Sequence, residues 1–288
     1  MRLASYNIQY GRGRDGVFDL ARIAAALAGA DVIALQEVER FWQRSGLRDQ
    51  PEELAGLLGE YYWIYGPGLD VHAGGGEAGD RNRRRQFGNM LLSRRPILSS
   101  RNHLLPKYAS LGPMSLQRSA LEGVIESGRG NLRVYSVHLT HLSAETRMPQ
   151  VERLLEIHER APVEGAALSG GGLKDEWTRD GLPPPLPREA ILMGDFNFEP
   201  DSAEYTRIVG PVSPYGGRII NPHGLVDAWV AVGNAEGDGV TADIDGRDVR
   251  LDYCFVSAVL ADAIADAGID SGARGSDHQP IWVELDLD

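Results

Sequence analysis

Short apolar runs recur along the 288-residue chain and are separated by stretches with helical periodicity. Eight runs have the length and composition of strands. They cover residues 2–8, 31–36, 89–93, 120–126, 132–139, 190–194, 250–256 and 280–285. Several of them alternate in side-chain character, which is typical of an extended strand with two different faces. The pattern therefore predicts a protein rich in short strands.

Two helices are predicted in the first quarter of the chain. Asp19 is suited to cap the helix that follows it, because its side chain can accept from the free amides of the first turn. Leu20, Ile23 and Leu27 recur at helical spacing, which places them on one face. Pro51 suits the first turn of a second helix, where a missing amide proton costs nothing.

A third helix is predicted near residues 146–161. Ser143 or Thr146 can begin it, and Val151 and Leu154 start an apolar stripe. Pro149 is compatible with this helix only if it lies in the first turn, because further in its ring removes a hydrogen bond.

Two segments interrupt the pattern of strands and helices. Residues 66–86 are rich in glycine and arginine, and residues 162–188 contain three consecutive glycines and three consecutive prolines. The second segment could join two domains. We interpret both as surface insertions in a single domain spanning residues 1–288, because the strand after the second completes the same group of polar strand ends. The mixed order of strands and helices indicates a layered α/β domain.

Polar side chains lie at the ends of six apolar runs. They are Asn7, Gln9, Gln36, Glu37, His138, His141, Asp195, Asn197, Asp252, Asp277 and His278. Each has an ordinary structural explanation alone, since an acid before a strand usually caps a turn and a lone histidine usually packs. Ligands gather at strand ends in layered α/β folds, so together these residues predict one site. Asp195 and Asn197 would project together from one strand end, because residues i and i+2 share a face.

The chemistry open to these residues is narrow. Glu37 and Asn7 offer hard oxygen ligands, which suit Mg²⁺ or Mn²⁺ better than Zn²⁺. Asp252 can orient the imidazole of His278, as in a catalytic triad. A hard metal ion, amide and imidazole donors, and a base fit the hydrolysis of a phosphate ester.

Composition narrows the class of protein further. The formal charge of −12 opposes non-specific binding to nucleic acid, although the basic cluster at residues 81–86 is either a solvated loop or part of a nucleic-acid contact. Cys254 is the only cysteine and lies in an apolar run, which excludes an internal disulfide and a cysteine-based metal cluster. No apolar stretch has the length of a membrane helix and the N-terminus lacks a secretion signal, so we expect a cytoplasmic protein without a membrane span.

Three sequence blocks carry a resemblance to a known family. "LQEV" at 35–38, "GDFN" at 194–197 and "SDH" at 276–278 occur in the order found in the endonuclease/exonuclease/phosphatase (DNase I-like) superfamily. The resemblance covers essentially the whole chain, and residues 44–59 look most like a bacterial branch called metal-dependent hydrolases. It implies an α/β four-layer sandwich of two packed, mostly antiparallel sheets flanked by helices.

The resemblance also implies a metal site and a base. Glu37 would be the main Mg²⁺ ligand with Asn7 beside it, and Asp277 would bind the metal or lie next to it. Asp195 would orient or deprotonate the attacking water. Some relatives have an acid two residues after the first asparagine, whereas this chain has the neutral Gln9, which would weaken any contact with a second metal.

Further positions match residues that hold the phosphate in the family. Those expected to contact it directly are Arg118, His138, Asn197 and His278, with Asp252 orienting His278 and His141 lining the substrate pocket. A structural role for His141 is an equal alternative. The family therefore implies a complete hydrolytic site in this chain.

These observations favour a divalent-metal-dependent phosphoesterase that hydrolyses a phosphodiester or a phosphomonoester. A nuclease and a catalytically silent binding module on the same fold are the alternatives. The expected substrate is a phosphorylated small molecule, a nucleotide or a lipid head group, and nucleic acid is disfavoured by the net charge.

Overall fold

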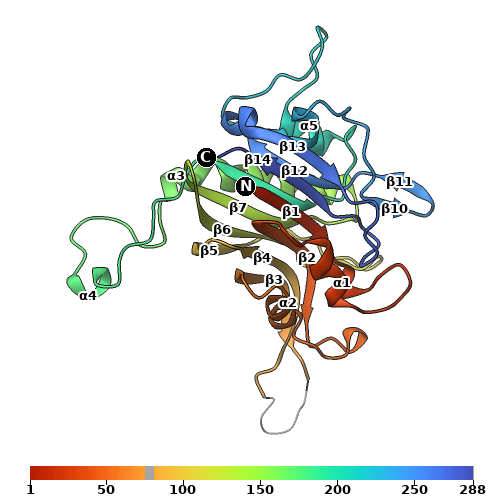
Figure 1. Ribbon diagram of the computed structural model, residues 1–288, viewed down its shortest axis with the longest axis horizontal. Coiled ribbons are helices and arrows are strands. Elements are labelled where there is room, and N and C mark those ends of the chain that lie inside the picture. Colours follow the sequence, from red (N-terminus) through yellow and green to blue (C-terminus); the bar gives the residue numbers. More distant parts are fainter. Residues whose placement is uncertain (75–80, 288) are drawn as a thin grey trace.

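The computed structural model describes residues 1–74 and 81–287 and contains two packed six-stranded sheets (Figure 1). The first sheet has the order β13-β14-β1-β2-β4-β3. Its strands are β1 (Arg2–Asn7), β2 (Val32–Arg40), β3 (Tyr62–His72), β4 (Arg84–Ser93), β13 (Ile264–Ile269) and β14 (Ile281–Leu285). Only β1 and β2 are parallel neighbours in this sheet.

The second sheet has the order β5-β6-β7-β8-β12-β9. Its strands are β5 (Ile97–Leu104), β6 (Ser119–Ser127), β7 (Gly130–His138), β8 (Ala190–Asp195), β9 (Leu225–Asp227) and β12 (Asp252–Ser257). Here β7 and β8 are the parallel pair. A separate hairpin joins β10 (Ala242–Ile244) to β11 (Arg247–Val249).

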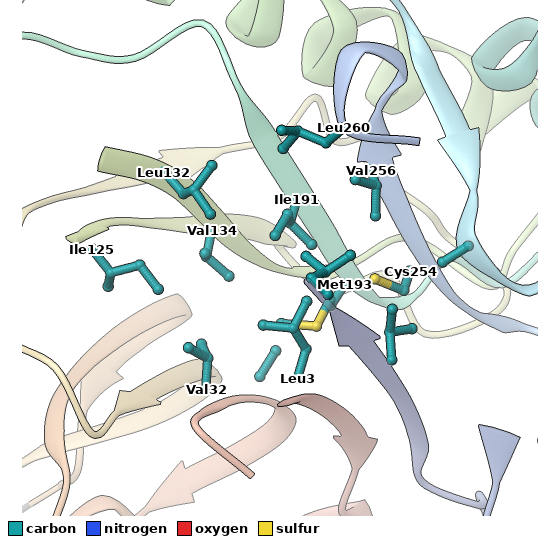
Figure 2. Close-up of a cluster of buried hydrophobic side chains, with 14 of the residues drawn as sticks. Leu3, Val32, Ile125, Leu132, Val134, Ile191, Met193, Cys254, Val256 and Leu260 are labelled. Atoms are coloured by element: carbon teal, nitrogen blue, oxygen red, sulfur yellow. The ribbon is translucent and has the colours of Figure 1, made fainter. Parts of the chain in front are cut away.

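Apolar side chains from both sheets meet in one central core. Figure 2 shows Leu3 and Val32 from the first sheet facing Val134, Ile191 and other side chains of the second. Burying such side chains stabilises the fold by about 25 cal/mol for each Å² of apolar surface removed from water. The core fixes the two sheets against each other, so strand ends from both sheets are held at one edge.

Helices cover the outer face of each sheet. The described residues form α1 (Leu20–Ala26), α2 (Gln50–Leu58), α3 (Ala144–Glu164), α4 (Asp175–Thr178), α5 (Ala203–Val209) and α6 (Ala228–Ala231). Side chains of α1 pack on β1 and β2, and those of α3 and α5 pack on the second sheet. The expected four-layer sandwich is confirmed. In the described part of the chain, no helix is both long and apolar enough to cross a membrane.

The predicted helix starts are largely confirmed. Asp19 accepts from the amides of Ala21 and Arg22 and caps α1, and Ser143 caps α3 in a capping box with Thr146. Pro149 lies in the sixth position of α3, so the expectation that it occupies the first turn was wrong. The carbonyl it leaves without an amide partner belongs to an exposed residue, where water can satisfy it.

The expectation of a loop at residues 66–86 was also wrong. β3 continues to His72 and β4 begins at Arg84, so most of this segment forms an antiparallel hairpin. Pro67 fits because β3 is an edge strand and its register shifts between Pro67 and Leu69, where no ladder hydrogen bond is lost. Residues 75–80 of the expected insertion lie outside the described residues.

The second expected insertion, residues 162–188, begins inside α3 and continues as a long excursion that carries α4 (Figure 1). Its return is anchored to the second sheet. Leu186 is buried with Val124 and Ala161, and the carbonyl of Pro187 accepts from Arg133 at 2.7 Å. All eight predicted strands are present, whereas β3, β5, β9, β10, β11 and β13 were not predicted.

Candidate active site

The polar residues singled out in the sequence converge where strands of both sheets end. Asn7 is the last residue of β1, and its neighbour in the parallel ladder is Gln36 of β2. In the second sheet, His138 ends β7 and is paired with Asp195, which ends β8. Asp252 begins β12 directly opposite Asp195. Register in the two sheets therefore brings these side chains to one edge.

Glu37 reaches this edge through a distortion of β2. The pairing of β2 with β4 shifts register between Leu35 and Val38, and Glu37 adopts a left-handed backbone with φ of 58°. A non-glycine residue in this region costs roughly 1 kcal/mol or more, and such bulges re-aim side chains next to functional sites. Its carboxylate lies beside the end of β1, where the side chain of Asn7 opposes the effect of burial on the pKa of Glu37.

Asp195 is the centre of the hydrogen-bond network. Its Oδ2 accepts from Asn7 Nδ2 at 2.9 Å and lies 3.3 Å from His138 Nε2. His278 Nε2 lies 3.8 Å from the same oxygen. The other oxygen of Asp195, Oδ1, accepts from the backbone amide of Asn197 at 2.9 Å. The carboxylate thus joins side chains from both sheets and from the loop before β14.

The environment raises the affinity of Asp195 for a proton. Burial raises its pKa first of all and the neighbouring charge of Asp252 adds to this, while His278 acts in the opposite direction. A carboxylate whose pKa approaches neutrality can accept a proton from water and release it again. Asp195 therefore has the properties of a general base.

Hydrogen bonding fixes His138 in one neutral tautomer. Arg118 Nη1 lies 3.0 Å from His138 Nδ1, and because a guanidinium only donates, Nδ1 must accept. The ring proton is then on Nε2, which faces Asp195. Burial lowers the pKa of His138 well below its ordinary value, and the charge of Arg118 lowers it further. His138 is therefore a neutral donor.

His278 has the opposite electrostatic setting. Its Nδ1 donates to Asp252 Oδ2 at 2.8 Å, as the sequence predicted. Burial lowers the pKa of His278, but Asp252 and then Asp195 outweigh burial and raise it overall. The imidazole is held as a cation with Nε2 directed toward Asp195. Such a group can donate to a phosphoryl oxygen or to a leaving group.

Arg118 is buried and carries its charge into the site. Its Nη2 donates to Nδ1 of the exposed His141 at 3.4 Å, in addition to the bond to His138. Burial lowers the pKa of Arg118, and Glu37 and then Asp195 raise it. A guanidinium remains protonated in any case, so it brings positive charge next to the two carboxylates.

The side chains of Asn197 and Asp277 each form a hydrogen bond with another part of the protein. Asn197 Nδ2 donates to the carbonyl of Leu139 at 3.0 Å, which leaves its other N–H bond for a ligand. Asp277 Oδ2 accepts from Gln9 Nε2 at 2.5 Å. The neutral Gln9 thus ties Asp277 to the turn after β1.

A divalent cation fits the donor set beside Asn7. Burial raises the pKa of Glu37, Asp277 adds to this, and Arg118 and His278 oppose it, so a cation would relieve a buried carboxylate. Among the described residues, no three histidine, cysteine, aspartate or glutamate side chains are arranged to hold a metal by themselves. Mg²⁺ commonly takes only one or two carboxylates and completes its shell with water and phosphate oxygens.

Ser276 and Thr241 help to position the site and were not predicted from the sequence, whereas Gln36 was among the predicted strand-end residues. Ser276 Oγ donates to the carbonyl of Asn7 at 2.7 Å and accepts from the amide of His278 at 3.2 Å. Thr241 Oγ1 accepts from the amide of Asp252 at 3.1 Å. Gln36 Nε2 donates to Ser136 Oγ at 3.0 Å and links the two sheets. Of the two missed residues, only Ser276 had a visible signal in the sequence, because it lies within the block "SDH".

Comparison with known proteins gives a family and a set of similar folds. The model of the Endonuclease/Exonuclease/phosphatase family matches residues 4–278. An endonuclease/exonuclease/phosphatase from Beutenbergia cavernae is 22% identical with a TM-score of 0.67, and the match covers 100% of this chain and 71% of that one. The search of curated proteins gave no match.

Two structural relatives are known by more specific names. A mannosyl-6-phosphatase of Bacteroides thetaiotaomicron is 18% identical with a TM-score of 0.59, covering 99% of each chain. A truncated TDP2 from Caenorhabditis elegans is 16% identical with a TM-score of 0.56, covering 99% of this chain and 96% of that one. At these identities the similarity shows the fold.

Proposed function

Because the chain belongs to the endonuclease/exonuclease/phosphatase family, whose members are hydrolases that act on phosphoesters, we propose that it is a divalent-metal-dependent phosphoesterase. The observation that carries the proposal is the environment of one carboxylate. Asp195 has Asn7 Nδ2, His138 Nε2 and His278 Nε2 at 2.9, 3.3 and 3.8 Å from a single oxygen. The carboxylate of a candidate base is thus surrounded by several hydrogen-bond donors that could bind the oxygens of a phosphate.

The attacking water is activated by Asp195. Its raised pKa allows it to take a proton from water near neutral pH, and Asn7 and the amide of Asn197 keep its two oxygens in place. A positioned general base contributes roughly 10²–10⁴-fold to a rate. The proton leaves the water as its oxygen forms a bond to phosphorus, and the bond between phosphorus and the leaving oxygen breaks.

Charge that develops on the phosphoryl oxygens is met by donors that are already in position. His278 presents a cationic N–H that Asp252 orients, His138 presents a neutral N–H, and Arg118 supplies positive charge behind it. Preorganised donors of this kind contribute about 10²–10³-fold each in the transition state. His278 is also placed to protonate the leaving oxygen.

Mg²⁺ or Mn²⁺ would be held by Glu37 and Asn7, with Asp277 in its surroundings. When bound, the ion supplies Lewis-acid stabilisation of the phosphoryl oxygens. The donors are oxygen atoms of carboxylates and an amide, which match these hard cations.

The substrate of this proposal is a phosphorylated small molecule, a nucleotide or a lipid head group, as a diester or a monoester. The net charge of −12 continues to disfavour long nucleic acids, whose binding rests on many Lys and Arg contacts. The relatives named above include both a sugar phosphatase and TDP2, so the fold accommodates different phosphoesters.

Turnover of bis-p-nitrophenyl phosphate and p-nitrophenyl phosphate tests the proposal. We expect hydrolysis with Mg²⁺ or Mn²⁺, loss of activity with EDTA, and recovery when the metal is restored. Glu37→Gln should lower kcat/KM by at least about a hundredfold while the melting temperature is kept, because it removes a ligand and not a packing group. Glu126→Gln, an exposed acid on β6, is the matched control and should retain full activity.

Two results would reject the assignment. One is unchanged turnover in Glu37→Gln. The other is the absence of turnover of every phosphoester with every divalent ion, combined with intact binding of a ligand, which would indicate a silent binding module.

A further inference from the structure

Five residues beside the candidate active site form a compact Arg–aromatic cluster. They are Tyr10, Trp42, Arg44, Arg85 and Phe87. They come from η1 (Gln9–Gly11), from η2 (Gln43–Ser45) and the residue before it, and from the start of β4. The catalytic steps described above do not use any of these residues.

Arg44 is the centre of the cluster. Its guanidinium carbon lies 4.1 Å from the ring centre of Tyr10, 4.7 Å from that of Trp42 and 5.7 Å from that of Phe87. Its Nη2 forms an ion pair of 2.6 Å with Glu39, whose side chain is fully buried. Stacking and the ion pair hold this guanidinium in one place while about two fifths of its side chain stays exposed to solvent.

Arg85 adds a charge that the described residues do not neutralise. Its guanidinium carbon lies 5.0 Å from the ring centre of Trp42, and its Nε is buried without a hydrogen-bond partner. Trp42 is itself fixed, because Nε1 donates to the carbonyl of Gln86 at 2.8 Å. No acid among residues 1–74 and 81–287 forms an ion pair with Arg85, whereas its neighbour Arg84 is paired with Asp70 at 2.8 Å.

The cluster is continuous with the candidate active site. The ring centre of Phe87 lies 5.7 Å from the guanidinium of Arg44 and 6.0 Å from that of Arg118. Glu39, which holds Arg44, is two residues beyond Glu37 on β2. A ligand bound at Glu37 and Arg118 would therefore extend directly onto the cluster.

From this geometry we infer that the Arg–aromatic cluster binds a second phosphate group of the substrate, distinct from the one that is hydrolysed. The inference rests on the proposed function and names the class of substrate: a compound with two phosphate groups. Guanidinium groups present planar sets of N–H donors that match phosphate oxygens. The ring of Trp42 contacts both guanidinium groups, and Arg85 has no acidic partner among the described residues, so an anion bound there would be stabilised.

Two kinds of compound share this chemistry. One is a nucleotide with a phosphate on both its 3′ and 5′ sides, and the other is a sugar bisphosphate, so each has two phosphate groups. The test therefore uses one pair of each kind: the p-nitrophenyl ester of thymidine 3′-phosphate with and without a 5′-phosphate, and glucose 1,6-bisphosphate against glucose 1-phosphate. A preference within only one pair identifies the kind of substrate.

Arg85→Gln is the variant for this test. Replacing Arg44 would leave Glu39 buried without its partner and destabilise the fold, whereas Arg85 has no such partner among the described residues. We expect the wild-type protein to have a kcat/KM at least about tenfold higher for the doubly phosphorylated member of a pair. Arg85→Gln should reduce this ratio to within about twofold of one without changing turnover of the other member. Arg84→Gln, the matched control, should keep the ratio.

A binding measurement separates this inference from the proposed function. Calorimetry with thymidine 3′,5′-bisphosphate and thymidine 3′-phosphate needs no turnover, and Arg85→Gln should weaken only the bisphosphate. If bis-p-nitrophenyl phosphate is hydrolysed but both pairs show ratios near one, or if Arg85→Gln keeps the preference, the second phosphate site is overturned and the hydrolase stands. If nothing is hydrolysed, the proposed function fails, and equal affinities in calorimetry would then overturn the phosphate site as well.

Discussion

At the scale of single residues, the candidate site depends on two histidines with opposite charge states. His138 accepts from Arg118 and must stay neutral, whereas His278 donates to Asp252 and is held as a cation. Asp195 Oδ2 lies between them, 3.3 Å from His138 Nε2 and 3.8 Å from His278 Nε2. The sequence shows three histidines and four acids among the candidate residues, and only their surroundings in the fold assign each a separate task.

The pair of His278 and Asp252 should behave as one unit. We expect His278→Ala to lower kcat by about 10²–10⁴-fold, since a donor to the phosphoryl group is lost. Asp252→Asn should lower kcat substantially by itself but add little in the His278→Ala background, because the aspartate acts through the imidazole. A double-mutant cycle on kcat measures this, and fully additive losses would contradict the pairing.

His158 makes stability depend on pH far from the candidate site. It lies in α3, and its Nδ1 accepts from Arg133 Nη2 at 3.2 Å. Because Nδ1 must be unprotonated to accept this bond, the bond forms with the neutral ring. Burial lowers the pKa of His158 to about 4, and the charge of Arg133 contributes.

As the pH falls, His158 therefore becomes protonated in the unfolded chain at a higher pH than in the folded chain. The contribution of His158 to stability is complete above pH 6.5 and is lost as the pH falls from 6.5 to about 4. The full loss amounts to about 3 kcal/mol. Urea unfolding at several pH values should show that the free energy of unfolding of the wild type declines as the pH falls from 6.5 to about 4. In His158→Asn this decline should be less steep, by the slope that corresponds to one proton. The exposed-histidine control, His223→Gln, should keep the decline, and identical slopes in His158→Asn and the wild type would refute the assignment.

At the scale of the elements, apolar periodicity was sufficient to predict the buried strands, but it did not predict the edge strands. β5 alternates between half-buried and exposed positions over "ILSSRNHL", so its apolar content is too low to mark it as a strand. β3 contains Gly66, Pro67 and Gly68, which are turn residues by composition. These strands exist because β6 and β4 supply hydrogen-bonding partners, which a local pattern does not contain.

Capping signals in the sequence were reliable because they are local. Ser143 Oγ accepts from the amide of Thr146, and Thr146 Oγ1 accepts from the amide of Ser143. We expect Ser143→Ala to lower the free energy of unfolding by about 1 kcal/mol, because the amide of Thr146 loses its side-chain acceptor. Thermal or urea denaturation measures the change. Ser169, an exposed serine outside the helices, is a control that should change little, and equal stabilities of both variants would contradict the capping role.

At the scale of the whole molecule, the site exists only because two sheets are packed in one relative orientation. The first sheet supplies Asn7 and Glu37, and the second supplies His138 and Asp195. The sequence blocks indicated which residues belong together through a family resemblance. They did not contain the bulge at Glu37 or the link from Gln36 to Ser136 across the sheets, since both arise from pairing between distant segments.

The Arg–aromatic cluster illustrates the same limit. Residues 81–86 were interpreted as a solvated loop or a nucleic-acid contact, because the sequence shows only a run of basic side chains. In the fold, Arg84 pairs with Asp70 while Arg83 and Arg85 lie over Phe41 and Trp42. Three neighbouring arginines therefore have different surroundings, which only the hairpin of β3 and β4 determines.

Crystals soaked with Mn²⁺ and inorganic phosphate test the central claim most directly, because anomalous diffraction locates the metal without reference to turnover. We predict one Mn²⁺ coordinated by oxygens of Glu37 and Asn7 at about 2.1 Å, with phosphate against His278 and Arg118. Mn²⁺ bound away from Glu37, or phosphate that never contacts His278 while the metal site is filled, would contradict the account.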